Sequence, residues 1–451
     1  MKSIAVIFLV LGLLMPLTAS GQNKIFPYKY FSDDLPNGLR VITVPTDYPN
    51  IVALYIVVST GSRNEVEPGK SGFAHLFEHL MFRGTEKVSA DQYNEALKNA
   101  GADSNAYTSD DRTVYHTVFS KEDFERIMTL EADRFQNLKV PIDLFKTETK
   151  AVLGEYNKNA SSPVRKLYEV LRDKAFESHT YRHTTMGYLR DVENMPNQYD
   201  YSLEFFKRYY RPEYTTIIVA GDVKHENVLA LTQKYWGEWK RGNYVPQIPS
   251  EPEQNEPRSA EVDWPQQTLP WIAVAYKGPA YSDDQKDKPA LDLIGSLGFS
   301  QTSDLYQRLV IKEQKVDALE PDFENHRDAY LLTVVARVKD PKDVDYVRNE
   351  IIKTFESFKT ASVPKEKLDA VKSNLKYSFA LSLNDSQAIA ENLAPFISLR
   401  RTPETINKLY DTYASITPAD LQAMAKKYFV EKGRTTVTLS NKEKASNGTE
   451  K

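Results

Sequence analysis

A proline-rich segment near the middle of the chain limits how the protein can fold. Residues 242–258 read GNYVPQIPSEPEQNEPR, with four prolines and no periodic apolar pattern. Proline fixes φ and removes a backbone donor, so such a segment forms an extended linker rather than part of a core. The chain has 451 residues, too many for one ordinary core. We therefore expect two folded halves, 22–241 and 259–440, joined by a linker at 242–258.

The two halves show the same order of elements at both ends. A strand pattern at 51–59 leads to a helical pattern around His75, and one at 271–277 leads to a helical pattern around Leu291. The first half closes with FKRYYR and then TTIIVA, and the second with AKKYFV and then TTVTL. Each half thus ends with an amphipathic helix followed by a strand. A duplicated α+β domain is the simplest explanation.

Strand and helix patterns occur in runs within the first half. This order favours an antiparallel-rich sheet with helices packed on one face. Gly101 is placed to end one helix, and Asp110-Asp111-Arg112 to turn the chain between two strands. The expected strands are Leu39–Val44, Ile51–Ser59, Ser104–Thr108, Thr113–Phe119 and Thr216–Ala220, and the expected helices are Phe73–Met81, Ala90–Ala100, Lys121–Leu138, Ile142–Asn157, Val164–Phe176 and Gln198–Tyr210.

Both ends of the chain differ from the folded halves. Residues 1–21 have a basic start, an apolar run at 4–15 and small residues at the exit, the pattern of a secretory signal peptide. The run is short for a bilayer span, which takes about 20 residues; an uncleaved anchor stays the alternative. We therefore expect a periplasmic or other extracytoplasmic location, with no integral membrane span after signal cleavage. The polar tail 441–451 is expected to be disordered.

Composition narrows the chemistry and the partners. A formal net charge of −4 is nearly balanced, so it gives no electrostatic reason to expect nucleic acid as a partner. The chain contains no cysteine, so disulfides do not stabilise it. Any metal must be held by histidine, aspartate or glutamate.

The pentapeptide HLFEH at 75–79 lies in an apolar run, although the chain has only seven histidines. On a helix, His75 and His79 present their imidazoles from adjacent turns of one face, as two corners of a zinc tetrahedron require. Glu78 lies beside them, where a carboxylate can take a proton from a water at the metal. This order is the inverse of the HExxH helix. Burying two histidines and a carboxylate without partners would be costly, which favours a metal site over a plain core helix.

Other polar residues have simpler interpretations. Glu148 and Glu155 share one helix face and alone would indicate a solvated surface. His179 and His183 also have the i, i+4 spacing, but the threonines and glycine that follow argue against a helix, so a second metal site there is the weaker alternative. His116 lies in a strand pattern and is expected to contribute packing.

Longer stretches carry a family resemblance. HLFEHLMFRGT is followed, 75 intervening residues after His79, by Glu155 in ETKAVLGE. The likeness continues through GADSNAYTS, through EADRFQNLKVPIDLFKTE and through the close of the first half at 205–222. These stretches resemble the pitrilysin/insulinase family of inverted-motif zinc peptidases, in the short two-domain type similar to the processing-peptidase beta subunit. The resemblance covers essentially the whole mature chain, strongly in the first half and weakly in the second.

The resemblance implies a role for each residue of the motif. It implies that His75, His79 and Glu155 bind one zinc ion per chain. It implies that Glu78 is the general base and that Glu148 supports the site from behind the ligands. The fold it implies is two related α+β domains per half-molecule, with two half-molecules enclosing a chamber that admits unfolded peptides.

A substrate strand is also implied. Asn105 and Ala106 match the family's edge strand beside the metal, where a peptide adds as an extra β-strand through backbone hydrogen bonds. The alternative is that the two residues only end a strand.

One part of the family's pattern is missing. Members that act alone carry an arginine and a tyrosine, in the second half-molecule, that reach the substrate carbonyl. Here the arginine place falls near Val310 and the tyrosine place near Asp317 or Ala318, while Arg308 sits on another helical face. We therefore expect a heterodimer in which a homologous subunit supplies the pair, with a homodimer as second choice.

Two functions follow from these observations. The first is a zinc metalloendopeptidase that hydrolyses peptides or unfolded polypeptides with a zinc-activated water. The alternative is a non-catalytic binding or assembly subunit that retains the peptidase fold. The presence of both histidines and both glutamates of the motif favours the enzyme.

Overall fold

The computed structural model describes residues 24–441. The predicted signal peptide at 1–21 lies outside this range, as does the predicted tail after Asn441. Asn441 itself donates hydrogen bonds to the backbone carbonyls of Trp264 and Gln266 at 3.1 and 3.0 Å.

The first sheet has six strands in the order β1-β2-β6-β3-β5-β4. Every neighbouring pair is antiparallel except β2 and β6. The β4 strand lies at one edge. The strands are β1 (Phe31–Asp34), β2 (Arg40–Pro45), β3 (Ile51–Val58), β4 (Asp103–Thr108), β5 (Thr113–Ser120) and β6 (Thr215–Gly221).

The second sheet repeats this pattern with five strands in the order β7-β11-β8-β10-β9. Again one pair is parallel, β7 with β11, and the others are antiparallel. The position and direction of each strand match β2, β6, β3, β5 and β4 of the first sheet, and only β1 has no counterpart. The strands are β7 (Arg258–Asp263), β8 (Trp271–Lys277), β9 (Val316–Asp322), β10 (Leu331–Val338) and β11 (Arg434–Ser440). The predicted class, two homologous α+β domains, is confirmed.

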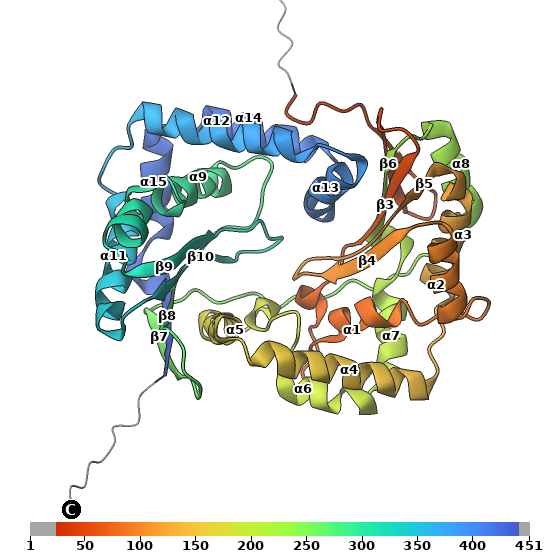
Figure 1. The fold of residues 1–451 in the computed structure, drawn as a ribbon, viewed down its shortest axis with the longest axis horizontal. Helices are drawn as coiled ribbons and strands as arrows, with labels where there is room; N and C mark the ends of the chain where they lie inside the picture. Colours follow the sequence, from red (N-terminus) through yellow and green to blue (C-terminus); the bar gives the residue numbers. More distant parts are fainter. Residues whose placement is uncertain (1–23, 442–451) are drawn as a thin grey trace, which may run out of the picture.

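The helices pack mainly on the sheet of their own half (Figure 1). All six helices and five strands expected in the first half are present, with ends within three residues of the expected ones. Sequence patterns missed β1, α6 and α8. The helices of the first half are α1 (Phe73–Leu80), α2 (Ala90–Asn99), α3 (Phe124–Asn137), α4 (Ile142–Ala160), α5 (Pro163–Ala175), α6 (Leu189–Asn194), α7 (Tyr199–Tyr209) and α8 (His225–Trp236). Those of the second half are α9 (Asp287–Phe299), α10 (Asp304–Tyr306), α11 (Val344–Ser357), α12 (Lys365–Ser382), α13 (Ser386–Arg400), α14 (Glu404–Ser415) and α15 (Pro418–Tyr428).

One helix of each half covers the sheet of the other half. The α13 helix packs on β3 and β6, and α5 packs on β7, β8 and β11 (Figure 1). Apolar clusters fill both contacts, one joining Leu393 to Tyr55 and the other joining Leu171 to Ala273. The helices of one half therefore cover only one face of its sheet, as expected, and the second face is covered from the other half.

The contact of α13 with the first sheet predicts a stability effect. Leu393 is fully buried there, so Leu393→Ala should lower the free energy of unfolding by about 2–5 kcal/mol through lost burial and a residual cavity. Leu381→Ala is the matched control, because that side chain is 77% exposed and should change stability by less than about 0.5 kcal/mol. Urea unfolding measures both variants. Equal effects would contradict a buried contact.

Candidate metal centre

The helix α1 begins at a buried carboxylate. Glu65 accepts hydrogen bonds from the backbone N–H groups of Gly72 and Ala74 at 2.8 and 2.7 Å. Gly72 has φ of 91°, a left-handed conformation that suits glycine. Glu65 thus accepts hydrogen bonds from backbone amides that the first turn of any helix leaves without partners. Its burial raises its pKa to about 8. The turn that carries His75 is fixed at its start.

The apolar neighbours of the motif hold α1 in place. Phe73, Leu76, Phe77 and Leu80 are buried in the core of the first half. Leu76 and Leu80 share one face by their i, i+4 spacing, and His75 and His79 share the adjacent face. The two imidazoles therefore point away from the core, towards α4.

Three metal-binding side chains meet between α1 and α4. One ligand atom from each of His75, His79 and Glu155 lies within 4.8 Å of the others, and no second group of three appears among residues 24–441. Glu155 Oε2 lies 3.6 Å from His75 Nε2 and 3.5 Å from His79 Nε2. The structure thus brings the predicted third ligand, with 75 residues between it and His79, against the two histidines.

This donor set fits a zinc ion. Tetrahedral donors about 2.0–2.1 Å from a metal lie about 3.3 Å from one another, close to the 3.6 and 3.5 Å that separate Glu155 Oε2 from the two imidazole nitrogens. Burial lowers the pKa of His75, which favours the neutral imidazole that a metal requires. The Glu155 side chain is 40% exposed, so the cluster is open to solvent on one side. An open side is what a catalytic metal needs and a structural one does not.

Glu148 lies behind His79. Its Oε2 atom is 3.9 Å from His79 Nδ1, is buried, and has no hydrogen-bond partner among residues 24–441. A histidine that binds metal through Nε2 usually donates its other ring N–H to such a carboxylate. The other oxygen, Oε1, lies 2.9 Å from Arg83 Nε, so the buried carboxylate keeps a charged partner.

The Glu78 carboxylate is held by the edge strand. Thr108, the last residue of β4, donates its hydroxyl to Glu78 Oε2 at 2.7 Å. This leaves the other oxygen of Glu78 available beside the two histidines. Neither Thr108 nor Arg83 was among the residues expected at the site.

The predicted substrate residues lie on an open sheet edge. Asn105 and Ala106 are in β4, which pairs with β5 on one side and forms the edge of the sheet on the other. The N–H of Ala106 donates to Asn105 Oδ1 at 2.8 Å rather than to the backbone of another strand. A carbonyl of an added strand could take the place of that side chain.

The other histidines have separate partners. His179 and His183 flank a short 3-10 turn at 180–182 and do not share a helix. His179 Nε2 lies 3.0 Å from Asp328 Oδ2, whereas His183 Nδ1 lies 3.0 Å from the Thr184 carbonyl. His116 stacks on Tyr55, with ring centroids 4.9 Å apart. The weaker alternative of a second metal site at His179 and His183 therefore finds no support among residues 24–441, and His116 contributes packing as expected.

The contact between Glu148 and His79 gives a testable expectation. Glu148→Gln should weaken zinc affinity by about 10–100-fold, because the amide is a poorer acceptor for the His79 ring N–H. Competition with a fluorescent zinc chelator measures it. Glu122→Gln, an exposed carboxylate in the turn before α3, is the control and should leave affinity unchanged. Unchanged affinity in Glu148→Gln as well would count against the contact.

Several known proteins are similar to this chain in sequence and fold. Residues 40–188 match the family described as Insulinase (Peptidase family M16), and residues 198–375 match the Peptidase M16 inactive domain. The zinc protease PqqE of Helicobacter pylori is 29% identical over 434 residues, covering 95% of this chain and 96% of that protein. A probable mitochondrial-processing peptidase subunit beta of Arabidopsis thaliana is 26% identical, covering 92% of this chain and 79% of that one. The crystal structure of a protease from Helicobacter pylori has a TM-score of 0.85 at 29% identity, covering 91% of this chain and 99% of that one. These matches along nearly the whole chain show that the protein belongs to the pitrilysin/insulinase family, peptidase family M16.

Proposed function

We propose that the protein is a zinc metalloendopeptidase that cleaves peptides or unfolded polypeptides. The observation that carries this proposal is the meeting of His75, His79 and Glu155 within 4.8 Å, with Glu78 beside them. When bound there, a zinc ion polarises a carbonyl and brings the pKa of a water towards neutrality. The relative named zinc protease PqqE supports the same chemistry.

The chain's own residues supply the proton transfers. Glu78 takes a proton from the water that attacks the peptide carbonyl and delivers it to the departing amine. Its hydrogen bond from Thr108 keeps one carboxylate oxygen fixed while the other moves the proton. Glu148 orients His79 from behind. One carboxylate does the chemistry and the other positions a ligand.

The edge strand binds the substrate in this proposal. A peptide that pairs with Asn105 and Ala106 on β4 runs past Thr108, whose hydroxyl touches the proposed base. Backbone pairing selects an extended chain and ignores most side chains. Folded proteins offer no such free strand and should resist cleavage.

A second chain completes the chamber. Arg308 donates to the Tyr346 hydroxyl at 2.7 Å and pairs with Glu350, so it is engaged within the C-terminal half. At the expected tyrosine place, Asp317 pairs with Arg337 at 2.7 Å. The name of one relative, a subunit beta, supports the existence of a partner subunit. In this proposal that partner supplies the arginine and the tyrosine. A homodimer is the second choice.

Export is part of the proposal and rests on the pattern of residues 1–21. The helices between residues 24 and 441 include none of the length and hydropathy that crossing a bilayer requires. A mature chain that begins near residue 22 and is recovered from the extracytoplasmic fraction would support this location.

The alternative of a non-catalytic subunit is not favoured. The match described as an inactive domain covers residues 198–375. The cluster of His75, His79 and Glu155 lies outside that range, on α1 and α4. The part that carries the centre matches the Insulinase family instead.

A hydrolysis assay tests the function and the partner together. The zinc-loaded chain, alone and mixed with a homologous chain that carries the arginine and tyrosine but no zinc motif, is given an unstructured peptide and a folded protein. We expect cleavage of the peptide only, with a large increase in the mixture. Full activity of the isolated chain would exclude the second subunit, and no cleavage in either sample would exclude the peptidase.

A further inference from the structure

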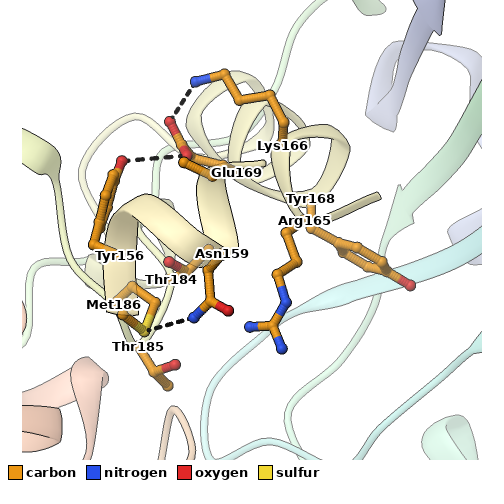
Figure 2. Close-up of a pocket in the computed structure, with 10 residues that line it drawn as sticks. Tyr156, Asn159, Arg165, Lys166, Tyr168, Glu169, Thr184, Thr185 and Met186 are labelled. Carbon is orange, nitrogen blue, oxygen red and sulfur yellow. Dashed lines mark hydrogen bonds and ion pairs between the residues drawn. The ribbon is translucent and has the colours of Figure 1, made fainter. Parts of the chain in front are cut away.

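A small pocket opens where α4 and α5 meet. It encloses about 130 Å³ and is bordered by the end of α4, the start of α5 and the loop 184–186. In Figure 2, the side chains of Asn159 and Arg165 come together over this hollow, with the two threonines of the loop on its other side. No residue proposed for the chemistry lines it.

The pocket lies at the end of the metal centre. Glu148 lies against Arg83 and His79 at the end of α1, whereas Glu155 lies between His79 and His75, so α1 and α4 run in opposite directions. Asn159 is one turn beyond Glu155 on the same face of α4 and therefore lies past the His75 end of the cluster. The loop is fixed against the same end of α1, because a Cβ on Gly187 would lie 2.7 Å from the carbonyl carbon of Ser71.

The charges of the pocket leave one cation free. Glu169 has both oxygens occupied, Oε1 by Lys166 at 2.7 Å and Oε2 by the Tyr156 hydroxyl at 3.5 Å. Arg165 is exposed, and its guanidinium forms no hydrogen bond or ion pair with any residue from 24 to 441. The pocket therefore has no free carboxylate to attract a cation, and it keeps an unpaired guanidinium for an anion.

The neutral lining groups suit the same ligand. Asn159 uses its amide only for a long contact to the Met186 sulfur, at 3.5 Å. Thr184 and Thr185 bring two hydroxyls, which donate as readily as they accept. A guanidinium, an amide and two hydroxyls can all donate to a carboxylate.

We propose that this pocket binds an aspartate or glutamate side chain of the peptide substrate and makes the enzyme selective for acidic residues near the cleaved bond. The proposal rests on the proposed peptidase function. The cavity has the volume of about four water molecules at 30 Å³ each, enough for one short side chain rather than a peptide segment. Asn159 follows Glu155 by four residues on α4, so the pocket lies about one helical turn, roughly 5.4 Å, beyond a proposed metal ligand.

Binding of matched peptides tests the pocket without relying on turnover. The zinc-loaded Glu78→Gln variant is titrated with fluorescent unstructured peptides that carry glutamate, glutamine or lysine at one position, which is moved along the peptide. At one position the glutamate peptide should bind about tenfold more tightly than the glutamine peptide, as a charge-assisted hydrogen bond predicts. Adding Arg165→Gln should abolish this preference, and Arg165→Glu should transfer it to lysine.

Lys150→Glu is the matched control, because it makes the same kind of charge reversal on an exposed position of α4 outside the pocket. It should keep the preference for glutamate. Equal dissociation constants for glutamate and glutamine at every position, or a glutamate preference that survives Arg165→Glu, would overturn the pocket. Hydrolysis by the unmutated, zinc-loaded chain with its partner separates the two proposals. Cleavage without acidic preference rejects only the pocket, whereas selective binding with no cleavage of any peptide rejects only the peptidase.

Discussion

Replacing the proposed base should abolish hydrolysis while leaving the metal in place. Glu78→Gln removes the carboxylate that takes the proton from the attacking water, and general-base catalysis contributes about 10²–10⁴-fold. The new amide oxygen can still accept the hydrogen bond from Thr108, so the local structure has no reason to change. Glu78 is not in the ligand cluster formed by His75, His79 and Glu155. We therefore expect one zinc per chain and a rate lowered at least a hundredfold.

Two measurements on the same sample decide this. Atomic absorption gives the zinc content, and cleavage of a quenched fluorescent peptide gives the rate. Glu95→Gln, an exposed carboxylate on α2, is the control and should keep both. Loss of zinc from Glu78→Gln would show that the residue is a ligand, and an unchanged rate would remove it from the mechanism.

Loss of the third ligand should abolish both metal binding and hydrolysis. Glu155→Ala leaves two histidines, whereas a catalytic zinc takes three protein ligands and one open position. We expect zinc content to fall from about one per chain to near zero. The rate of peptide hydrolysis should be as low as that of the wild type after a chelator has removed its zinc. Zinc added back should restore the chelated wild type and leave the variant inactive.

Thermal unfolding provides a readout that does not depend on activity. A ligand that binds only the folded state stabilises it by about 2.7 kcal/mol at one hundred times its dissociation constant. Zinc should therefore raise the melting temperature of the wild type but not that of Glu155→Ala. Asp143→Asn, an exposed change at the start of the same helix, should respond like the wild type. A zinc-dependent shift retained by Glu155→Ala would mean that the metal is held elsewhere.

Sequence patterns located the elements that have a strong period or a fixed spacing. The i, i+4 histidines lie on α1 because the buried apolar side chains of Phe73, Leu76, Phe77 and Leu80 place that helix against the core. Duplication was visible because each half closes with the same helix and strand, and the repeated strand order confirms it. The β1 strand was missed because it is only four residues long and half exposed.

Contacts between distant segments could not be predicted from these patterns. Thr108 reaches Glu78 across 30 residues, and Glu65 reaches α1 from an irregular loop. Arg83 had a local signal, since it follows His79 by one helical turn, but the structure places it just beyond the last turn of α1. Nothing in its spacing identified Glu148 as the partner. Periodicity reports which face of an element is buried and says nothing of which other element covers it.

The exchange of helices between the halves also sets an order of events during synthesis. The face of the first sheet that carries Tyr55 is covered by α13, whose residues 386–400 are made more than 160 residues after the last strand of that sheet. Until α13 arrives, the newly made first half exposes an apolar sheet face, which is a site for aggregation. The half that holds the metal-binding residues thus completes its core only when most of the other half has been synthesised. A fragment that ends at the proline-rich linker and is released from the ribosome would stay bound to chaperones. It would not fold into an active enzyme.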